Sequence, residues 1–272
     1  MRIYGVDFTC APRRAKAITV AAGSLRHNRL AIEAVERLES FSAFEAFLAR
    51  PGPWTGGFDF PFSLPRQLVR DLGWPAQWPR LVGHCAGLTR AELRAAFDAY
   101  RNSRKPGNKY AHRATDLPAG SSSPMKLVNP PVALMFHEGA RRLLSAGVCI
   151  PALLQGEDTR VALEAYPGLL ARKQLGIRKS YKSDTRSEHT SARKAARRAL
   201  MRALLAGEPL GIRLEAPPAI ERRAIEDGSG DTLDALICAA QAAWGWRRRK
   251  SNYGLPETAP PGEGWIVTSL SS

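Results

Sequence analysis

Five acidic residues stand in settings where carboxylates could do chemistry. Asp7 ends the apolar run RIYGVDF, Asp59 lies in FDFP, Glu164 lies in LEAYP, and the helical string DTLD carries Asp231 and Asp234 three residues apart. An acid is costly to bury unpaired, so several that converge are best explained by a divalent cation that neutralises them. Taken singly, each acid has an ordinary alternative role as a helix cap or a salt-bridge partner.

Such a group of carboxylates has a preferred ligand and a preferred reaction. Hard oxygen ligands favour Mg²⁺ or Mn²⁺ over softer metals. Two such ions about 3.5–4 Å apart activate a water and stabilise the leaving oxygen when a phosphodiester is cleaved. The acids therefore predict a metal-dependent hydrolase that acts on phosphodiesters.

Short apolar runs predict the strands that would place these acids. The runs at 2–8, 17–23 and 29–35 are joined by turns, a spacing typical of an antiparallel meander. Further runs at 54–62 and 160–167 carry the acids Asp59 and Glu164 near their ends. Two more runs predict strands, at 148–154 and 264–270.

Helical spacing of apolar residues predicts the elements between these strands. Thr89 and Glu92 form a capping box for a helix at 88–104. We expect one α/β domain over 1–272, with a helical, loop-rich insertion around 66–130. Other helices are predicted at 42–50, 132–147, 186–206 and 229–246.

The Ala-rich helix at 229–246 would deliver two of the acids. Ser229 or Asp231 is expected to cap it. Asp231 and Asp234 project from one face, near the start of the helix. The opposite face is apolar and would pack against a sheet, through Leu233, Leu236, Ile237, Ala240 and Trp244.

Four strings, in this order along the chain, carry a resemblance. They are GVDFTCAP at 5–12, FDFPFSLP at 58–65, LEAYPGLL at 163–170 and DTLDALICAAQAAW at 231–244. Together they resemble the family known as domain of unknown function 429, whose members are predicted nucleases with a ribonuclease H-like fold. The strings span most of the chain. The resemblance implies a mixed five-stranded sheet, with its first three strands antiparallel and helices on both faces.

The resemblance also implies a role for each acid. Asp7 would be the metal-bridging carboxylate, Glu164 the second ligand from a neighbouring strand, and Asp234 the acid delivered by the final helix. Asp231 lies beside it, and the paired DxxD is similar to the Holliday-junction resolvase branch of the same superfamily. Asp59 would either bind metal or hold the FDFPFSLP loop. The implied catalytic set is Asp7, Glu164, Asp234 and Asp231, and these four with Asp59 would be ligands for two Mg²⁺ or Mn²⁺ ions.

The basic residues predict a polyanionic partner. Lys and Arg number 40 against 25 Asp and Glu, a formal net charge of +15. Between residues 172 and 202 there are eleven Lys or Arg and two acids, and 101–113 holds five without an acid. Phosphate contacts from these residues would bind nucleic acid of any sequence, and Tyr110 and Tyr181 could stack on bases. A merely solvated basic face is the alternative. The predicted nucleic-acid-binding residues are Arg104, Lys105, Lys109, Arg186, Arg193, Lys194 and Arg197.

Composition and local patterns predict a cytoplasmic protein with no membrane partner. Hydrophobic residues make up 44% of the chain, as in ordinary globular proteins. The four cysteines lie far apart without a CxxC pair, so we expect reduced, packed thiols. The first residues lack a signal-peptide pattern, and no run approaches the ~18 apolar residues of a membrane span.

Three functions from different classes stay open at this point. The first is a nuclease that hydrolyses DNA or RNA with metal held by carboxylates. The second is a nucleic-acid-binding protein that keeps the fold without turnover. The third is an actin-like phosphotransferase, which also uses a strand-end Asp with Mg²⁺. The third is disfavoured because FTC follows Asp7 where a DxGxT string is needed.

Overall fold

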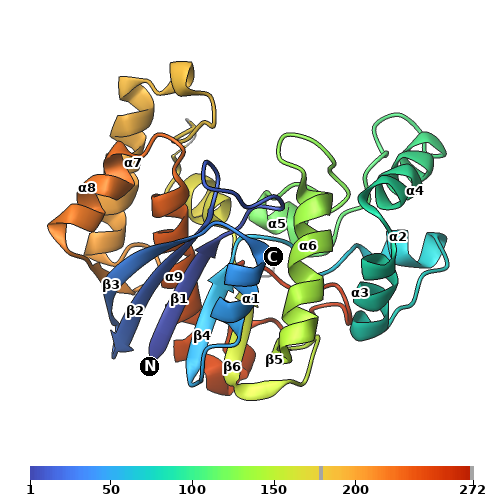
Figure 1. Cartoon of the computed structure of the whole chain (residues 1–272), viewed down its shortest axis with the longest axis horizontal. Coiled ribbons are helices and arrows are strands. Elements are labelled where there is room, and N and C mark those ends of the chain that lie inside the picture. Colours follow the sequence, from blue (N-terminus) through green and yellow to red (C-terminus); the bar gives the residue numbers. More distant parts are fainter. Residues whose placement is uncertain (178–179, 270–272) are drawn as a thin grey trace.

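A mixed sheet of seven strands forms the centre of the computed structural model, which describes residues 1–177 and 180–269 (Figure 1). Arg178 and Lys179 of the predicted basic segment lie outside the described residues, as does residue 270 of the predicted strand 264–270. The strands are β1 (Arg2–Asp7), β2 (Ile18–Arg26), β3 (Arg29–Leu38), β4 (Trp54–Phe58), β5 (Val148–Cys149), β6 (Glu157–Glu164) and β7 (Arg213–Glu215).

The strand order is β5-β6-β4-β1-β2-β3-β7. The first three strands are antiparallel, as predicted, while β4 pairs in parallel with β1, and β6 pairs in parallel with β4. The predicted count of five strands is not confirmed. The sheet also contains β5 and β7, two short edge strands of 2 and 3 residues. Strands this short are hard to predict from sequence. They flank the five central strands, which run in the order β6-β4-β1-β2-β3.

Nine α-helices lie in the described part of the chain, and their bounds agree with most predicted helices. The segment 66–130 contains four of them, which Figure 1 shows beside the sheet. The predicted capping box of Thr89 and Glu92 is present. The helices are α1 (Phe41–Leu48), α2 (Arg66–Asp71), α3 (Trp78–Gly87), α4 (Arg90–Asn102), α5 (Asp116–Ala119), α6 (Val132–Ala146), α7 (Ser191–Ala206), α8 (Pro218–Glu226) and α9 (Asp231–Arg247).

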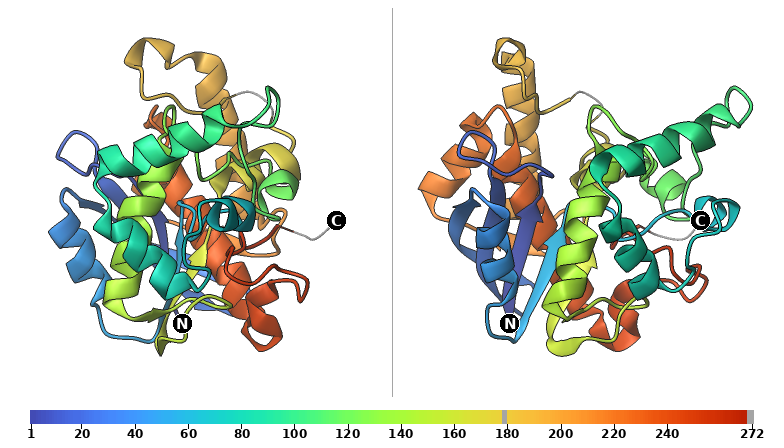
Figure 2. Two further views of the ribbon diagram at one scale, coloured as in Figure 1. Left: turned by 90° about the vertical axis from the view of Figure 1, so that its right-hand side faces the viewer. Right: turned by 45° about the vertical axis from the view of Figure 1, so that its right-hand side comes forward.

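Alternation along the strands builds a core on each face of the sheet. Tyr4 and Val6 of β1 belong to one cluster of buried side chains, together with residues of α1, α3 and α6. Ile3 belongs to a second cluster with residues of α7 and α9. Because successive strand residues point to opposite faces, one short strand contributes to both cores. The predicted placement of helices on both faces is confirmed, and the views in Figure 2 show the two sides.

Helix α9 lies directly on the sheet and is buried from Asp231 to Gly245. A β-carbon at Gly5 of β1 would collide with the backbone of Ala235 and Ala239, so only glycine permits this close approach. The predicted cap is wrong. Gly230 precedes the helix with a φ of 81°, and Ser229 instead donates a 2.6 Å hydrogen bond to Asp227.

The predicted strand at 264–270 does not form within its described residues. Ile266 makes a single parallel bridge to Glu164. Gly264 and Thr268 have φ values of 73° and 72°, which interrupt an extended run on both sides of that bridge.

The sequence also predicts unpaired, packed cysteines and no membrane-spanning segment. The four cysteines are free, and three of them are buried. Of the helices among the described residues, none combines the length and the apolar character that crossing a bilayer requires.

Candidate metal centre

Two of the predicted acids are brought together by the pairing of β1 with β4. Val6 is the register partner of Phe58, so Asp7 and Asp59 come at the carboxyl ends of neighbouring parallel strands. The amide of Asp59 donates a 2.9 Å hydrogen bond to the carbonyl of Val6, which continues the ladder by one residue. Backbone hydrogen bonds therefore fix the two acids side by side.

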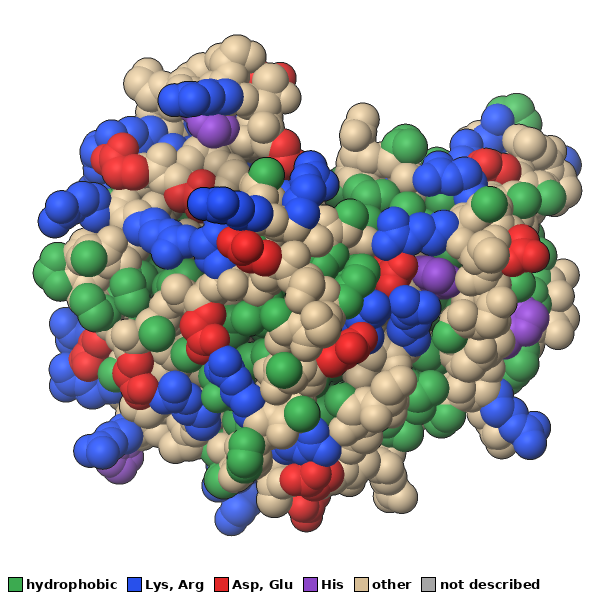
Figure 3. Space-filling model, viewed as in Figure 1, with side chains coloured by type: hydrophobic (Ala, Val, Ile, Leu, Met, Phe, Trp, Pro, Cys, Tyr) green, Lys and Arg blue, Asp and Glu red, His purple; other side chains and the backbone are tan. Residues whose placement is uncertain are grey.

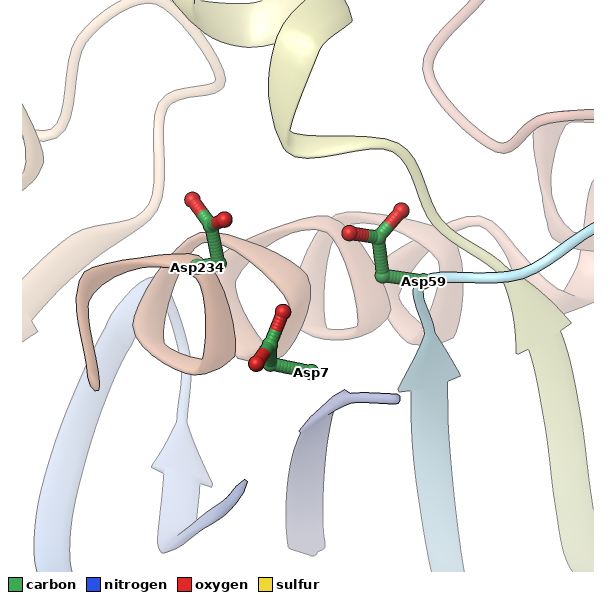
Figure 4. Close-up of side chains that lie close together, drawn as sticks. All are labelled: Asp7, Asp59 and Asp234. Carbon is green, nitrogen blue, oxygen red and sulfur yellow. The ribbon is translucent and has the colours of Figure 1, made fainter. Parts of the chain in front are cut away.

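The third acid is Asp234, which comes from the first turn of α9. One carboxylate oxygen from each of Asp7, Asp59 and Asp234 lies within 4.8 Å of the other two. Figure 4 shows the three side chains converging from β1, the end of β4 and α9. Asp7 and Asp234 are buried, and Asp59 is half-buried. These three residues form the aspartate site.

Two members of the aspartate site have no partner in the described part of the chain. None of the described residues donates a hydrogen bond to the carboxylate of Asp7 or Asp59. Asp234 differs, because Tyr181 donates a 2.6 Å hydrogen bond to its Oδ1 and Lys182 forms an ion pair with its Oδ2. Buried acids without partners are costly, so this group suits a ligand that brings positive charge.

Burial and mutual repulsion raise the pKa of every member of the site. Burial raises the pKa of Asp7 well above its ordinary value, and the neighbouring Asp231, Asp234 and Asp59 add to this effect. Burial raises the pKa of Asp59 to about 7. Burial also raises the pKa of Asp234, against the opposing effect of Lys182. Proton uptake is one way to relieve such a group, and a divalent cation is the other.

Glu164 does not join the aspartate site, although it ends β6 next to β4. It is 4% exposed, and Arg113 donates two hydrogen bonds to it, at 2.8 Å to Oε2 and 2.6 Å to Oε1. The amide of Phe62 donates a third, at 3.0 Å. Arg113 also binds Asp116 at 2.9 Å. The residue predicted as the second metal ligand is thus part of a buried ion-pair network.

Asp231 is also held by a cation, and it is not one of the three acids that converge. Lys16 Nζ lies 2.8 Å from its Oδ1 and 2.8 Å from Asp184. Burial lowers the pKa of Lys16, but Asp231 and Asp184 outweigh that effect and raise it above the ordinary value. The helical spacing does place Asp231 near Asp234, but the two carboxylates have different partners.

A cavity of about 800 Å³ opens over the aspartate site. Its walls carry five acids, which are Asp7, Asp59, Glu164, Asp184 and Asp231, and five cations. Three of these cations are paired with acids, Arg113 with Glu164, Lys16 with Asp231 and Lys182 with Asp234. The other two form no ion pair with any described acid, and they are Lys126 and Arg172.

The predicted nucleic-acid-binding residues fall into different environments. Lys105, Lys109 and Arg186 are exposed. Arg193 and Lys194 on α7 pair with acids, at 2.8 Å to Glu188 and 2.6 Å to Glu226. Figure 3 shows Lys and Arg side chains over α7 and over α4, with a notch in the outline between them.

Three predictions in the basic segments are corrected by burial. Arg197 is 2% exposed and donates 2.7 Å hydrogen bonds to the carbonyls of Ile225 and Tyr181, so it holds the chain together and does not lie on the basic surface. Tyr181, predicted to stack on a base, is itself buried and bound to Asp234. Arg104 is mostly buried and donates a 2.6 Å hydrogen bond to the carbonyl of Asn108 in its own loop.

Sequence reasoning missed the cations that decide which acids remain unpaired. Arg113 is 51 residues from Glu164, and Lys16 is 215 residues from Asp231. Lys182 lies within the basic segment, where nothing in the local pattern distinguishes it from its neighbours. Only the fold brings these side chains to their acids.

Comparison of this chain with known protein families, with curated proteins and with solved structures finds no match. The resemblance to family 429 stays a prediction.

Proposed function

We propose that this protein is a metal-dependent nuclease whose aspartate site holds Mg²⁺ or Mn²⁺. The observation that carries the proposal is the convergence of three carboxylates, two of which line a cavity and accept no hydrogen bond from any described residue. The donor set fits these ions, since all three ligands are carboxylate oxygens and the raised pKa values are those of a site short of positive charge. Asp7, Asp59 and Asp234 would hold the cation.

The arrangement of the sheet supports the ribonuclease H-like assignment within this proposal. Five neighbouring strands run in the order β3-β2-β1-β4-β6, and the first three are antiparallel. This agrees with the sheet that the resemblance implies, once the edge strands β5 and β7 are set aside. We assign the catalytic acids to the ends of β1 and β4 and to α9.

The chain's own residues would bind and orient the substrate. A bound divalent cation supplies Lewis-acid polarisation and activation of water. Lys126 and Arg172 line the cavity and pair with none of the described acids, so they would contact phosphate oxygens. Lys105, Lys109 and Arg186 are exposed and would attract the polyanion from a distance.

The number of metal ions that the site can hold depends on which acids are not already paired with a Lys or Arg. The sequence predicts two ions, which would need Glu164 or Asp231 as further ligands. Both are held by cations, Arg113 and Lys16. We therefore propose one ion at the aspartate site, and the stoichiometry of a calorimetric titration separates one ion from two.

The test is cleavage of single-stranded, double-stranded and branched DNA and RNA in Mg²⁺ or Mn²⁺. We expect cleavage that a chelator abolishes. The cleavage rate should fall at least ~100-fold in Asp7→Asn, since loss of a metal ligand costs more activity than loss of a residue that only hydrogen-bonds to a ligand. Asp158→Asn, an exposed acid at the other end of the sheet, is the matched control and should cleave normally. Failure to cleave every substrate overturns the proposal. Salt-sensitive binding that is equal in wild type and Asp7→Asn supports binding without turnover.

A further inference from the structure

Both oxygens of one aspartate are occupied by consecutive residues of a single loop. The hydroxyl of Tyr181 donates to Oδ1 of Asp234, and the ammonium of Lys182 binds Oδ2 of the same carboxylate. Each oxygen of Asp234 therefore already has a donor while Lys182 stays in place. The described stretch 180–190, which precedes α7, therefore reaches into the aspartate site.

The backbone is anchored at Tyr181 and directly after Lys182. Buried Arg197 donates a 2.7 Å hydrogen bond to the carbonyl of Tyr181, and the amide of Ser183 donates one of 3.1 Å to Gly228. A β-carbon at Gly230 would lie 2.7 Å from Cβ of Lys182, so the stem of the lysine packs against the start of α9. Packing and backbone contacts fix the base of the side chain, and its ammonium end remains at the cavity.

The charge of Lys182 acts on the whole aspartate site. It lowers the pKa of Asp7, Asp59 and Asp234 against the effect of their burial. Among the cations the structure describes, Lys182 is the one that forms an ion pair with a member of this site. Its side chain is 42% exposed and lines the cavity, so the ammonium has space to move into when it leaves Asp234.

We propose that Lys182 is a tethered counter-cation of the aspartate site, which a divalent cation must displace from Asp234 in order to bind. This inference rests on the proposed function. Two positive charges a few ångströms apart repel strongly in a partly buried site, so the ammonium and the metal exclude each other. A monovalent ion would replace the single positive charge of the Lys182 ammonium with another single charge. A divalent ion brings two positive charges where the ammonium supplied one. Lys182 thus sets both the affinity of the site and its preference for divalent ions.

Calorimetric titration with Mn²⁺ alone tests this competition, without substrate or turnover. Lys182→Gln should bind Mn²⁺ about tenfold more tightly than wild type, because the metal then meets no like charge at Asp234 and has no ammonium to displace. Lys126→Gln is the matched control. It removes the same charge from the same cavity, but Lys126 forms no ion pair with the described acids, so its affinity should stay within about twofold of wild type.

Thermal unfolding of the metal-free variants gives a second measurement. Lys182→Gln leaves three carboxylates without their counter-charge, so its melting temperature should fall below that of Lys126→Gln, and Mn²⁺ should restore it. Lys182→Met serves as a second neutral variant in case the glutamine variant folds poorly.

The outcomes separate this inference from the proposed function. If wild type binds Mn²⁺ and Lys182→Gln binds it equally or more weakly, the inference is overturned and the metal site stands. An equal gain in Mn²⁺ affinity in Lys182→Gln and Lys126→Gln also overturns it, because the gain would then come from removing any positive charge from the cavity. If neither wild type nor Lys182→Gln binds Mn²⁺, both the inference and the proposed function fail.

Discussion

The amide of Asp59 donates a 2.9 Å hydrogen bond to the carbonyl of Val6, the residue directly before Asp7. This bond extends the parallel pairing of β1 and β4 to the point where both strands end in an acid. The two carboxylates are therefore close because of the backbone, and no side-chain contact is needed to hold them. Their mutual repulsion favours the binding of a cation.

Replacing one member of this pair should weaken metal binding sharply. Asp59→Asn keeps the size of the side chain but removes a ligand charge, so Mn²⁺ affinity should fall at least ~10-fold in a calorimetric titration. Asp158→Asn, which is exposed at the start of β6, should bind as wild type. An affinity unchanged in Asp59→Asn would assign that residue to holding the FDFPFSLP loop instead.

The stability of the metal-free protein should depend on pH through Asp59. Its pKa is raised from 3.8 to about 7, so between these values the folded state holds a proton that the unfolded state has lost. Its contribution therefore favours folding at low pH and is lost as the pH rises through this window. Urea unfolding at steps from about pH 4.5 to about pH 7.5 should show stability falling more steeply in wild type than in Asp59→Asn. Parallel curves for the two proteins would contradict this.

Removing the charge of Glu164 should affect stability and leave metal binding intact. Glu164→Gln leaves buried Arg113 with Asp116 as its one remaining acidic partner among the described residues. This should lower the free energy of unfolding by about 3 kcal/mol. Glu157→Gln, an exposed acid on the same strand, should cost less than about 1 kcal/mol. Chemical denaturation and a Mn²⁺ titration of each variant check both statements. A loss of Mn²⁺ affinity with little loss of stability would restore Glu164 as a ligand.

Exposed lysines in the loop after α4 should contribute to the salt dependence of nucleic-acid binding. Lys105→Gln with Lys109→Gln should reduce the slope of log affinity against log salt by about 0.9 for each phosphate of duplex DNA that the variant no longer neutralises. Fluorescence anisotropy at several salt concentrations measures the slope. Lys250→Gln, at the opposite end of α9 from the aspartate site, is the control. An equal change in both proteins would mean that net charge alone matters.

Residues with a local signal were predictable, and residues defined by distant partners were not. Asp7 ends a strand and Asp234 starts a helix, and the sequence predicts both as ligands, whereas it leaves Asp59 open between binding metal and holding its loop. Glu164 has the same local setting as Asp59, and it differs only through Arg113, which the fold delivers from a loop in the segment 66–130. Periodicity predicts where a carboxylate lies along an element, but it carries no information about which cation neutralises it.

The close contact between Gly5 of β1 and the backbone of α9 should affect local unfolding around the site. A strand and a helix in direct backbone contact cannot separate by small side-chain motions, so the first turn of α9 and the ends of β1 and β4 should form one cooperative unit. Amide hydrogens in these three segments should then exchange with solvent through one shared opening, with a common free energy of opening. Mn²⁺ bound to the aspartates would slow all of them equally, which makes hydrogen exchange a map of how far the influence of the site extends.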